Sequence, residues 1–366
     1  MENCDVLIVG GGPAGSTCAW KLKQAGFDVL VLDKSYFPRG KVCGGWITPQ
    51  VLDRLNIDPG EYGQQRTLQP ISAFRTGIIG GDALQTLYDG PVSYGIRRYE
   101  FDHFLFERSG ARTQAGETVK SIKRSGQGWI VNGHIQTRLL IGAGGHFCPV
   151  ARLMGEAAKS KQPVVAQETE LKMDAAQAAR TRVRGEMPEL YFCPDMLGYG
   201  WCFRKGQYLN IGLGRRDNHG LSSHVAAFAS WLKSSGRVPF DLPEPFEGHA
   251  YHTYDQQARK RVGDHVMLIG DAAGLARGES GEGILPAVES GILAADAVIA
   301  CKRKYSRERL AIYEDSLIRR FGNPGAFDPL MLMPSRLKQF LGRRILASPA
   351  LTRRIVIEGW FLHLSQ

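Results

Sequence analysis

A glycine-rich turn near the start of the chain constrains the fold more than any other feature. Residues 6–9 form the short apolar run Val-Leu-Ile-Val, and residues 10–15 read Gly-Gly-Gly-Pro-Ala-Gly. Residues 16–25 then have helical spacing, and a second apolar run over 27–32 ends at Asp33. This order predicts a strand, a tight turn, a helix and a second strand, as at the start of a Rossmann-like α/β sheet.

Each glycine of this G-x-G-x-x-G pattern has a physical role. Gly10 permits the tight turn, Gly12 lets the backbone approach a pyrophosphate, and Gly15 lets the helix and the strand pack closely. The start of the helix supplies N–H donors and partial positive charge to phosphates. Asp33 follows Gly10 by 23 residues, as expected of an acid that accepts ribose hydroxyls. The pattern predicts a bound dinucleotide and leaves FAD and NAD open.

A second glycine cluster favours FAD. The apolar run 266–269 ends in Gly-Asp-Ala-Ala-Gly over 270–274, and a helix is predicted from residue 284 towards 300. A nicotinamide dehydrogenase has no need of this element, whereas the ribityl chain and second phosphate of FAD do. We expect Asp271 to take a ribityl hydroxyl. N–H groups of residues 281–284 would face the flavin pyrimidine edge, where a helix start stabilises the reduced, anionic form.

Further segments carry a family resemblance. They are Lys-Val-Cys-Gly-Gly-Trp at 41–46, Arg-Tyr-Glu-Phe-Asp at 98–102, Leu-Leu-Ile-Gly-Ala-Gly-Gly at 139–145, Tyr-Gly-Trp-Cys-Phe-Arg-Lys-Gly at 199–206 and Leu-Asn-Ile-Gly-Leu-Gly at 209–214. Together with the two glycine clusters, and in this order, they resemble the geranylgeranyl reductases among the FAD-dependent oxidoreductases built like p-hydroxybenzoate hydroxylase. The resemblance extends from about residue 4 to about residue 300.

The resemblance implies a Rossmann-like FAD-binding domain, an antiparallel β-sheet substrate domain and a helical C-terminal tail. The expected boundaries are 1–70, 95–162 and 262–302 for the FAD-binding domain, 71–94 and 163–261 for the substrate domain, and 303–366 for the tail. No metal ligands are expected. The predicted cofactor contacts are Gly10, Gly12, Pro13, Ala14, Gly15, Asp33, Lys34, Lys41, Cys43, Gly44, Arg98, Val119, Ala143, Gly144, Gly270, Asp271, Gly281, Gly283 and Ile284.

Two positions depart from the family pattern. Gly144 stands where the family has an acid that helps to hold FAD, and the proline that usually backs the flavin is absent near Ser280. Arg277 and Glu279 instead bring charges towards that edge. Both changes are compatible with FAD. They leave the electron donor open among NADPH, NADH and a separate reductase.

The candidates for direct chemistry are Cys43, Tyr199 and Trp201. Cys43 could relay a proton, or could be a small residue that permits close approach. Tyr199 and Trp201 lie in predicted strands whose aromatic side chains either cover the flavin or pack as ordinary core. The resemblance implies reduction of C=C bonds in an isoprenoid or other apolar substrate. The alternatives are a monooxygenase, either hydroxylase or epoxidase, acting through a flavin C4a-hydroperoxide, and a non-catalytic interaction protein stabilised by FAD.

The positive charge of the chain lies near its C-terminus. The formal net charge is +10, and residues 302–354 hold 13 Lys and Arg against 4 Asp and Glu. Pro334 and Pro349 bracket a basic amphipathic helix, which either packs on its own domain or contacts an anionic membrane peripherally. No motif supports nucleic-acid binding. The seven scattered cysteines lack a C-x-x-C pair and suit the cytoplasm, with the inner face of the membrane as the surface contacted.

Overall fold

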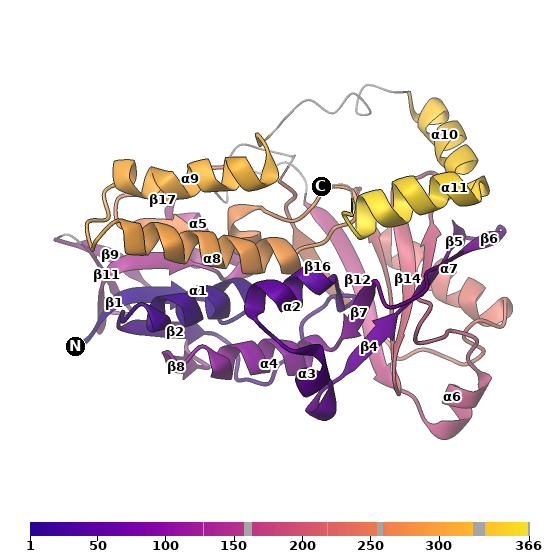
Figure 1. Ribbon diagram of the computed structural model, residues 1–366, viewed down its shortest axis with the longest axis horizontal. Helices are drawn as coiled ribbons and strands as arrows, with labels where there is room; N and C mark the ends of the chain where they lie inside the picture. Colours follow the sequence, from indigo (N-terminus) through magenta and orange to yellow (C-terminus); the bar gives the residue numbers. More distant parts are fainter. Residues whose placement is uncertain (127, 157–162, 218, 255–258, 325–333, 365–366) are drawn as a thin grey trace. The chain divides into compact units, whose positions relative to one another are not determined.

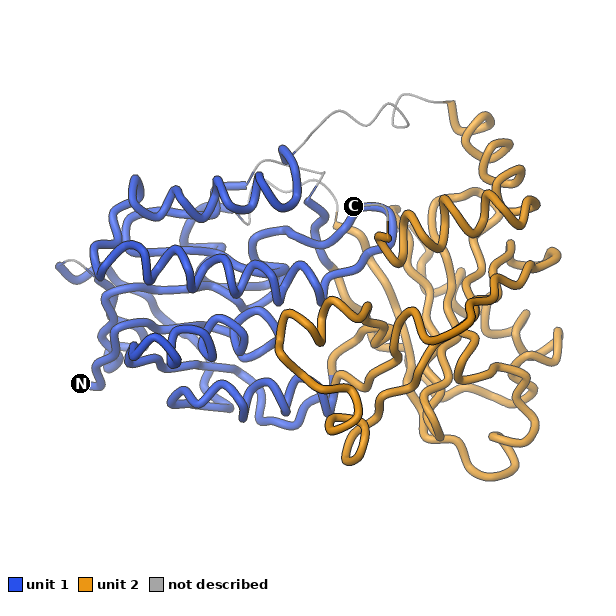
Figure 2. Tube along the Cα trace, viewed as in Figure 1, with its two compact units in different colours: residues 1–40, 99–161, 251–326 blue, residues 41–98, 162–250, 327–366 orange. Residues whose placement is uncertain are grey.

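The computed structural model describes residues 1–126, 128–156, 163–217, 219–254, 259–324 and 334–364. The chain divides into two compact units (Figure 2). Unit 1 comprises residues 1–40, 99–161 and 251–326, and unit 2 comprises residues 41–98, 162–250 and 327–366. Each unit is built around a sheet of its own.

The centre of unit 1 is a parallel sheet with the strand order β18-β11-β1-β2-β8. β1 lies in the middle, where Val6 pairs with both Leu139 and Val29. β17 pairs antiparallel with β18, and β10 and β9 extend antiparallel from β11. The bounds of these strands are Glu2–Val9 (β1), Val29–Asp33 (β2), Arg112–Ala115 (β8), Ile122–Ser125 (β9), Gly128–Val131 (β10), Ile135–Gly142 (β11), Val262–Gly263 (β17) and Val266–Leu268 (β18).

Helices α1 and α8 lie side by side against the sheet of unit 1 (Figure 1). Their backbones approach so closely that a Cβ on Gly291 of α8 would lie 2.6 Å from the Ala14 carbonyl oxygen of α1. α9 packs on α8, and the buried Glu289 of α8 accepts hydrogen bonds from Arg320 of α9 at 2.9 Å. The helices of unit 1 are Pro13–Gln24 (α1), Arg98–Arg108 (α4), Pro149–Leu153 (α5), Ile284–Ala300 (α8) and Arg307–Phe321 (α9), with short 3-10 turns at Gly145–Phe147 (η1) and Gly270–Ala273 (η2).

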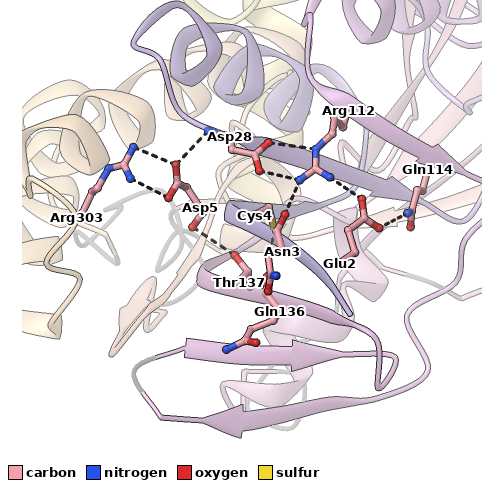
Figure 3. A network of polar contacts seen from close by, with 10 residues as sticks. All are labelled: Glu2, Asn3, Cys4, Asp5, Asp28, Arg112, Gln114, Gln136, Thr137 and Arg303. Carbon is pink, nitrogen blue, oxygen red and sulfur yellow. Dashed lines mark hydrogen bonds and ion pairs between the residues drawn. The ribbon is translucent and has the colours of Figure 1, made fainter.

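A polar network ties the amino ends of the parallel strands together (Figure 3). Arg112 of β8 donates to Asp28 before β2 at 2.8 Å and to Glu2 of β1 at 2.8 Å. Asp5 of β1 in turn forms an ion pair with Arg303 at 3.1 Å. Most of these side chains are partly exposed to solvent, so each pair contributes little to stability, about 1 kcal/mol or less. In open α/β sheets, ligands bind outside the opposite, carboxyl ends of the strands.

Unit 2 is built on a sheet with the order β16-β12-β15-β14-β13-β5-β6. The β12–β15–β14–β13 run is antiparallel, as the sequence predicts, while β13 and β5 pair in parallel. A smaller sheet has the order β3-β7-β4. The strands are Trp46–Ile47 (β3), Leu68–Ile71 (β4), Ala73–Ile78 (β5), Ala83–Leu87 (β6), Ser93–Ile96 (β7), Val164–Lys172 (β12), Glu189–Phe192 (β13), Gly198–Lys205 (β14), Tyr208–Arg215 (β15) and Glu247–Tyr251 (β16).

The two faces of this larger sheet are covered differently. One face packs against α7, with Val225, Phe228 and Leu232 buried there. The other face is rich in aromatic residues and packs against the C-terminal helices, including Leu346 and Phe361. The helices of unit 2 are Pro49–Leu55 (α2), Pro59–Gln65 (α3), Ala175–Arg180 (α6), Leu221–Ser234 (α7), Ser335–Ala347 (α10) and Pro349–Leu351 (α11), followed by a π-helical stretch at Thr352–Phe361 (η4).

The observed units divide the chain differently from the expected domains. Residues 41–70, expected with the FAD-binding residues, cluster with unit 2. The tail expected over 303–366 is split, because α9 packs in unit 1 and α10 to η4 pack in unit 2. Across the described residues, no helix combines the length and the apolarity needed to cross a bilayer.

Candidate functional site

The predicted turn forms at the carboxyl end of β1. Gly10 adopts φ +115°, where a side chain is strained, and a Cβ there would lie 2.7 Å from the Gly144 amide nitrogen. A Cβ on Gly15 would collide with the Gly10 carbonyl oxygen. The turn thus brings Gly10, Gly15, Ala143 and Gly144 together, because only hydrogen atoms fit between these backbones.

The start of α1 has the features of an anion-binding site. Gly12 is its N-cap, and within the described residues no side chain caps the helix. A Cβ on Gly12 would meet a single neighbour within 4 Å among the described atoms, the Arg39 guanidinium at 3.4 Å. Arg39 also pairs with the fully buried Asp102 at 3.3 Å. N–H donors, the helix dipole and a guanidinium therefore converge on one point, which fits a pyrophosphate. The sequence motif did not reveal Arg39.

Asp33 is buried at the end of β2 and faces the turn. Its Oδ2 accepts a hydrogen bond from the Gly11 amide at 2.8 Å, and its Oδ1 accepts one from the Ser35 amide at 2.9 Å. A carboxylate has about four lone-pair sites, so these bonds leave capacity for a ribose hydroxyl. Asp33 also shapes the turn itself, a role that the ribose hypothesis did not include.

The second glycine cluster lies against the first within unit 1. A Cβ on Gly270 would lie 2.8 Å from the Ala14 Cβ, and one on Gly283 would lie 3.3 Å from Asp271 Oδ1. Gly283 is the N-cap of α8, for which the described residues supply no side-chain cap. The starts of α1 and α8, predicted from segments more than 250 residues apart, thus belong to one cradle of closely apposed backbone. A ligand with two phosphates and a long polar chain fits such a cradle.

Arg277, one of the two charged residues expected beside this cradle with Glu279, is paired. Arg277 forms an ion pair with Glu282 at 3.3 Å, and its amide donates to the Glu282 carbonyl oxygen at 2.9 Å. Burial lowers the pKa of Arg277, and Glu282 opposes that effect. The departure from the family pattern therefore introduces an arginine with its own counter-charge.

In unit 2, the segment that contains Cys43 lies on the aromatic face of the sheet. The Cys43 amide donates to Glu168 Oε1 at 2.5 Å, and Asn210 Nδ2 donates to the Cys43 carbonyl oxygen at 3.3 Å. Asn210 Oδ1 accepts a hydrogen bond from Trp201 Nε1 at 2.7 Å. Both polar groups of the Cys43 residue are thus held by side chains of β12 and β15.

The two glycines after Cys43 permit this close fit. A Cβ on Gly44 would lie 3.0 Å from the Phe203 ring and 3.4 Å from Trp201 Nε1. Gly45 has φ +64°, and a Cβ there would lie 2.5 Å from Lys205 Nζ. Larger residues would lift the segment off the sheet, which explains the Cys-Gly-Gly sequence without reference to chemistry.

Two glutamates of β12 form a buried charged cluster beneath this segment. Glu170 accepts from Lys205 at 2.9 Å and from Arg97 at 3.0 Å. Burial acts to raise the pKa of Glu170, but the two cations lower it below its usual range. Burial raises the pKa of Glu168 to about 7, against the lowering by the Cys43 amide and Lys205. Sequence reasoning missed both glutamates, although acids two residues apart in a strand face the same side.

Tyr199 and Trp201 lie among aromatic rings of unit 2. The Tyr199 ring lies 5.4 Å from Phe361 and 6.1 Å from Trp201, and Trp201 is only 8% exposed. Trp46 contacts Phe361 and Phe203 from the Cys43 side. These contacts bring the three catalytic candidates to one face of the sheet. Their packing is also that of a hydrophobic core, so their catalytic role stays a prediction.

The predicted cofactor contacts are distributed over both units. Unit 1 holds Gly10, Gly12, Pro13, Ala14, Gly15, Asp33, Lys34, Val119, Ala143, Gly144, Gly270, Asp271, Gly281, Gly283 and Ile284, and unit 2 holds Lys41, Cys43, Gly44 and Arg98. Lys34 is exposed, Val119 is half-buried, and Arg98 is buried at the first turn of α4. The Lys41 ammonium contacts the His249 ring at 2.8 Å.

Known proteins are similar to this chain in sequence and in fold. A family model described as an NAD(P)-binding Rossmann-like domain matches residues 8–62. Digeranylgeranylglycerophospholipid reductase 3 of Methanosphaera stadtmanae is 29% identical, over 86% of this chain and 82% of that protein. Geranylgeranyl diphosphate reductase of Rhodobacter capsulatus is 28% identical, over 81% and 75%.

The fold resembles that of a geranylgeranyl bacteriochlorophyll reductase-like protein of Thermoplasma acidophilum, with a TM-score of 0.72, 21% identity, and coverage of 98% of this chain and 91% of that one. This likeness concerns the fold, while the similarity in sequence to the two reductases extends over most of the chain. The chain is therefore similar over most of its length, as a distant relative, to reductases of geranylgeranyl compounds.

Proposed function

We propose that this enzyme reduces C=C bonds of an isoprenoid or a similar apolar chain. The observation that carries the proposal is the aromatic face of the unit 2 sheet, on which Gly44 lies against Phe203 and Trp201. A surface of this kind suits an apolar substrate far better than a polar one. The names of the two sequence relatives, both reductases of geranylgeranyl compounds, support the same substrate class.

FAD, when bound and reduced, supplies the hydride for such a reduction. Gly10, Gly12 and Arg39 would hold its pyrophosphate through backbone N–H groups and positive charge, and Asp271 would hold its ribityl chain. Cys43 is the half-buried thiol of the candidate set and would move a proton at its Sγ. Tyr199 and Trp201 would orient the apolar chain and exclude water from it.

The test follows electrons from donor to product. The purified protein is reduced anaerobically with NADPH, NADH or dithionite, and a geranylgeranylated phospholipid is added under argon. We expect the flavin absorbance to return and a saturated product to appear by mass spectrometry. Rapid bleaching by NADPH or NADH alone would identify the donor, and bleaching by neither would indicate a separate reductase. A product that forms only with O2 and is heavier by one oxygen atom would show that the enzyme is a monooxygenase and would overturn the proposed reductase activity.

We also propose that helix α10 brings the enzyme to an anionic membrane surface, where a lipid substrate would be found. Leu337, Phe340 and Leu341 of α10 are 44%, 54% and 38% exposed, although they are apolar. Residues 334–354 contain six Lys and Arg and no Asp or Glu. Apolar side chains among cations are the composition of helices that lie in a membrane interface. Binding to anionic vesicles tests this contact.

A further inference from the structure

Two side chains from different strands, one ionisable and one uncharged, form hydrogen bonds with the backbone of Cys43. Its amide donates to Glu168 of β12 at 2.5 Å, and its carbonyl oxygen accepts from Asn210 of β15 at 3.3 Å. Asn210 Nδ2 also contacts the second Glu168 oxygen at 3.4 Å. Both side chains that hold the Cys43 backbone are themselves buried, so loss of either bond leaves a buried polar group without that partner.

The two glutamates beneath the segment differ in their partners. Glu170 is neutralised by Lys205 at 2.9 Å and Arg97 at 3.0 Å. Among the described residues, Glu168 has no ion-pair partner, and the Cys43 amide is its shortest contact. A buried carboxyl without a cation keeps its proton to higher pH than an exposed one, so Glu168 is the member of the pair whose charge changes near neutrality.

The charged groups around Glu168 come from each neighbouring element. Glu170 lies on the same strand, Lys205 lies on β14, and β15 contributes the neutral Asn210. The segment itself carries Cys43 and Lys41, and Lys41 contacts His249 of β16. Arg97 acts on Glu168 through Glu170, which it neutralises in part. Burial outweighs these influences, as the raised pKa of Glu168, about 7, indicates.

We propose that Glu168 is a pH-sensitive positioning residue, whose carboxylate clamps the Cys43 segment onto the sheet and whose protonated form loosens that clamp. The carboxylate accepts the Cys43 amide in a charge-assisted hydrogen bond, whereas the protonated carboxyl accepts it as a weaker neutral one. No covalent step is involved. The inference deepens the proposed function, since it concerns the segment that carries the proton-moving candidate.

Thiol labelling of the full-length protein tests the inference without flavin turnover or substrate. Cys43 is half-buried and the other six cysteines are buried, so a maleimide or iodoacetamide should label Cys43 first. Cys43→Ser identifies that site by loss of the label. Glu168→Gln keeps the shape and a neutral acceptor but cannot ionise.

We expect the ratio of the labelling rates, Glu168→Gln over wild type, to be near 1 at pH 5.5 and to rise to about tenfold at pH 8.5. Dividing the rates removes the intrinsic reactivity of the reagent, which is the same for both proteins. Glu170→Gln is the matched control, because it keeps Glu168. We expect labelling of Cys43 in this variant still to slow, relative to Glu168→Gln, as Glu168 ionises. The midpoint of that slowing should lie at lower pH than in wild type, because the variant lacks the negative charge next to Glu168. A ratio that stays constant with pH overturns the proposal.

A second measurement covers the case in which Glu168→Gln does not fold. In the wild-type protein labelled with 13C-glutamate, the Glu168 carboxyl should titrate near pH 7, well above the pKa of about 4.3 of a glutamate in a model peptide. A Glu168 resonance that titrates below pH 5 would overturn the inference. Neither measurement uses a substrate, so failure here is distinguishable from failure of the proposed reduction.

Discussion

A side chain at position 15 would occupy the space of the Gly10 carbonyl oxygen. The collision is with backbone, so a rotamer change cannot relieve it, and the turn that presents N–H groups at the start of α1 must move. The pattern at 10–15 is therefore informative, because the turn that creates the site can form only if residue 15 has no side chain.

Gly15→Ala should therefore weaken FAD binding by about 10- to 100-fold, the value of one charge-assisted hydrogen bond lost at the phosphates. Flavin content per protein and the dissociation constant of added FAD measure this effect. Gly90→Ala is the matched control, since a Cβ there has nothing within 4 Å and Gly90 does not adopt a positive φ. Full flavin content in Gly15→Ala would show that the cradle at α1 does not hold the cofactor.

Glu168 illustrates what sequence patterns cannot reveal at this scale. It is 125 residues from Cys43, and the two meet because the segment that contains Cys43 folds onto β12. Arg39 and Asp102 are likewise far apart in sequence. A motif reports residues that are close along the chain, whereas these contacts depend on the tertiary fold. The sequence therefore predicted the glycine turns and missed the charged partners that surround them.

At the scale of elements, periodicity predicted the structure well where packing follows a regular pattern. The helix expected from residue 284 towards 300 is α8, Ile284–Ala300, and the strand expected at Tyr199 and Trp201 is β14, Gly198–Lys205. The parallel pairing of β13 with β5 was not foreseen. That pairing joins segments more than 100 residues apart, and local sequence contains no signal for it.

Helix α10 has two sides with different surroundings. Gly342 and Leu346 pack against unit 2, a Cβ on Gly342 lying 3.0 Å from the Met196 sulfur. Leu337 and Phe340 are exposed, with Arg344 over the Phe340 ring at 5.4 Å. Removal of the whole tail would remove the cations and would also uncover the aromatic face of the sheet. Substitution of the cations alone is therefore the cleaner test of membrane contact.

A variant with Arg336, Lys338, Arg343 and Arg344 all changed to Gln should bind vesicles rich in anionic lipid at least about 100-fold more weakly, since each cation contributes about 1 kcal/mol. Co-sedimentation with vesicles of defined composition measures the loss. The matched control changes Lys302, Lys304, Arg307 and Arg309 to Gln, which alters the net charge equally on unit 1. Equal losses in both variants would contradict a specific role for α10.

At the scale of the whole molecule, the charge is unevenly distributed. Residues 302–354 hold a net +9 of the total +10, so the rest of the chain is almost neutral. That segment is divided between α9 of unit 1 and α10 to η4 of unit 2. The sequence located the charge correctly. The sequence did not predict this division. The apolar face of a helix shows that the helix packs against something, but it does not show which unit provides the surface.

The free energy of unfolding should depend on pH in part because of Glu168. Its pKa is raised from 4.5 to about 7 in the folded protein, so between these pH values folding retains a proton that the unfolded chain releases. The corresponding stabilisation is present below pH 4.5 and is lost as the pH rises through about 7. It amounts to at most about 3 kcal/mol. Glu170, whose pKa is lowered, contributes with the opposite sign and at lower pH.

The free energy of unfolding of wild type minus that of Glu168→Gln should therefore fall steadily between pH 4.5 and 8.5. Urea unfolding at a series of pH values measures this difference, and contributions from groups that both proteins share cancel in it. Glu170→Gln should give a smaller fall, because it keeps Glu168 and only removes a neighbouring negative charge that raises the Glu168 pKa. A difference between wild type and Glu168→Gln that does not vary with pH would show that Glu168 is ionised throughout, and that the Cys43 segment is held equally at every pH.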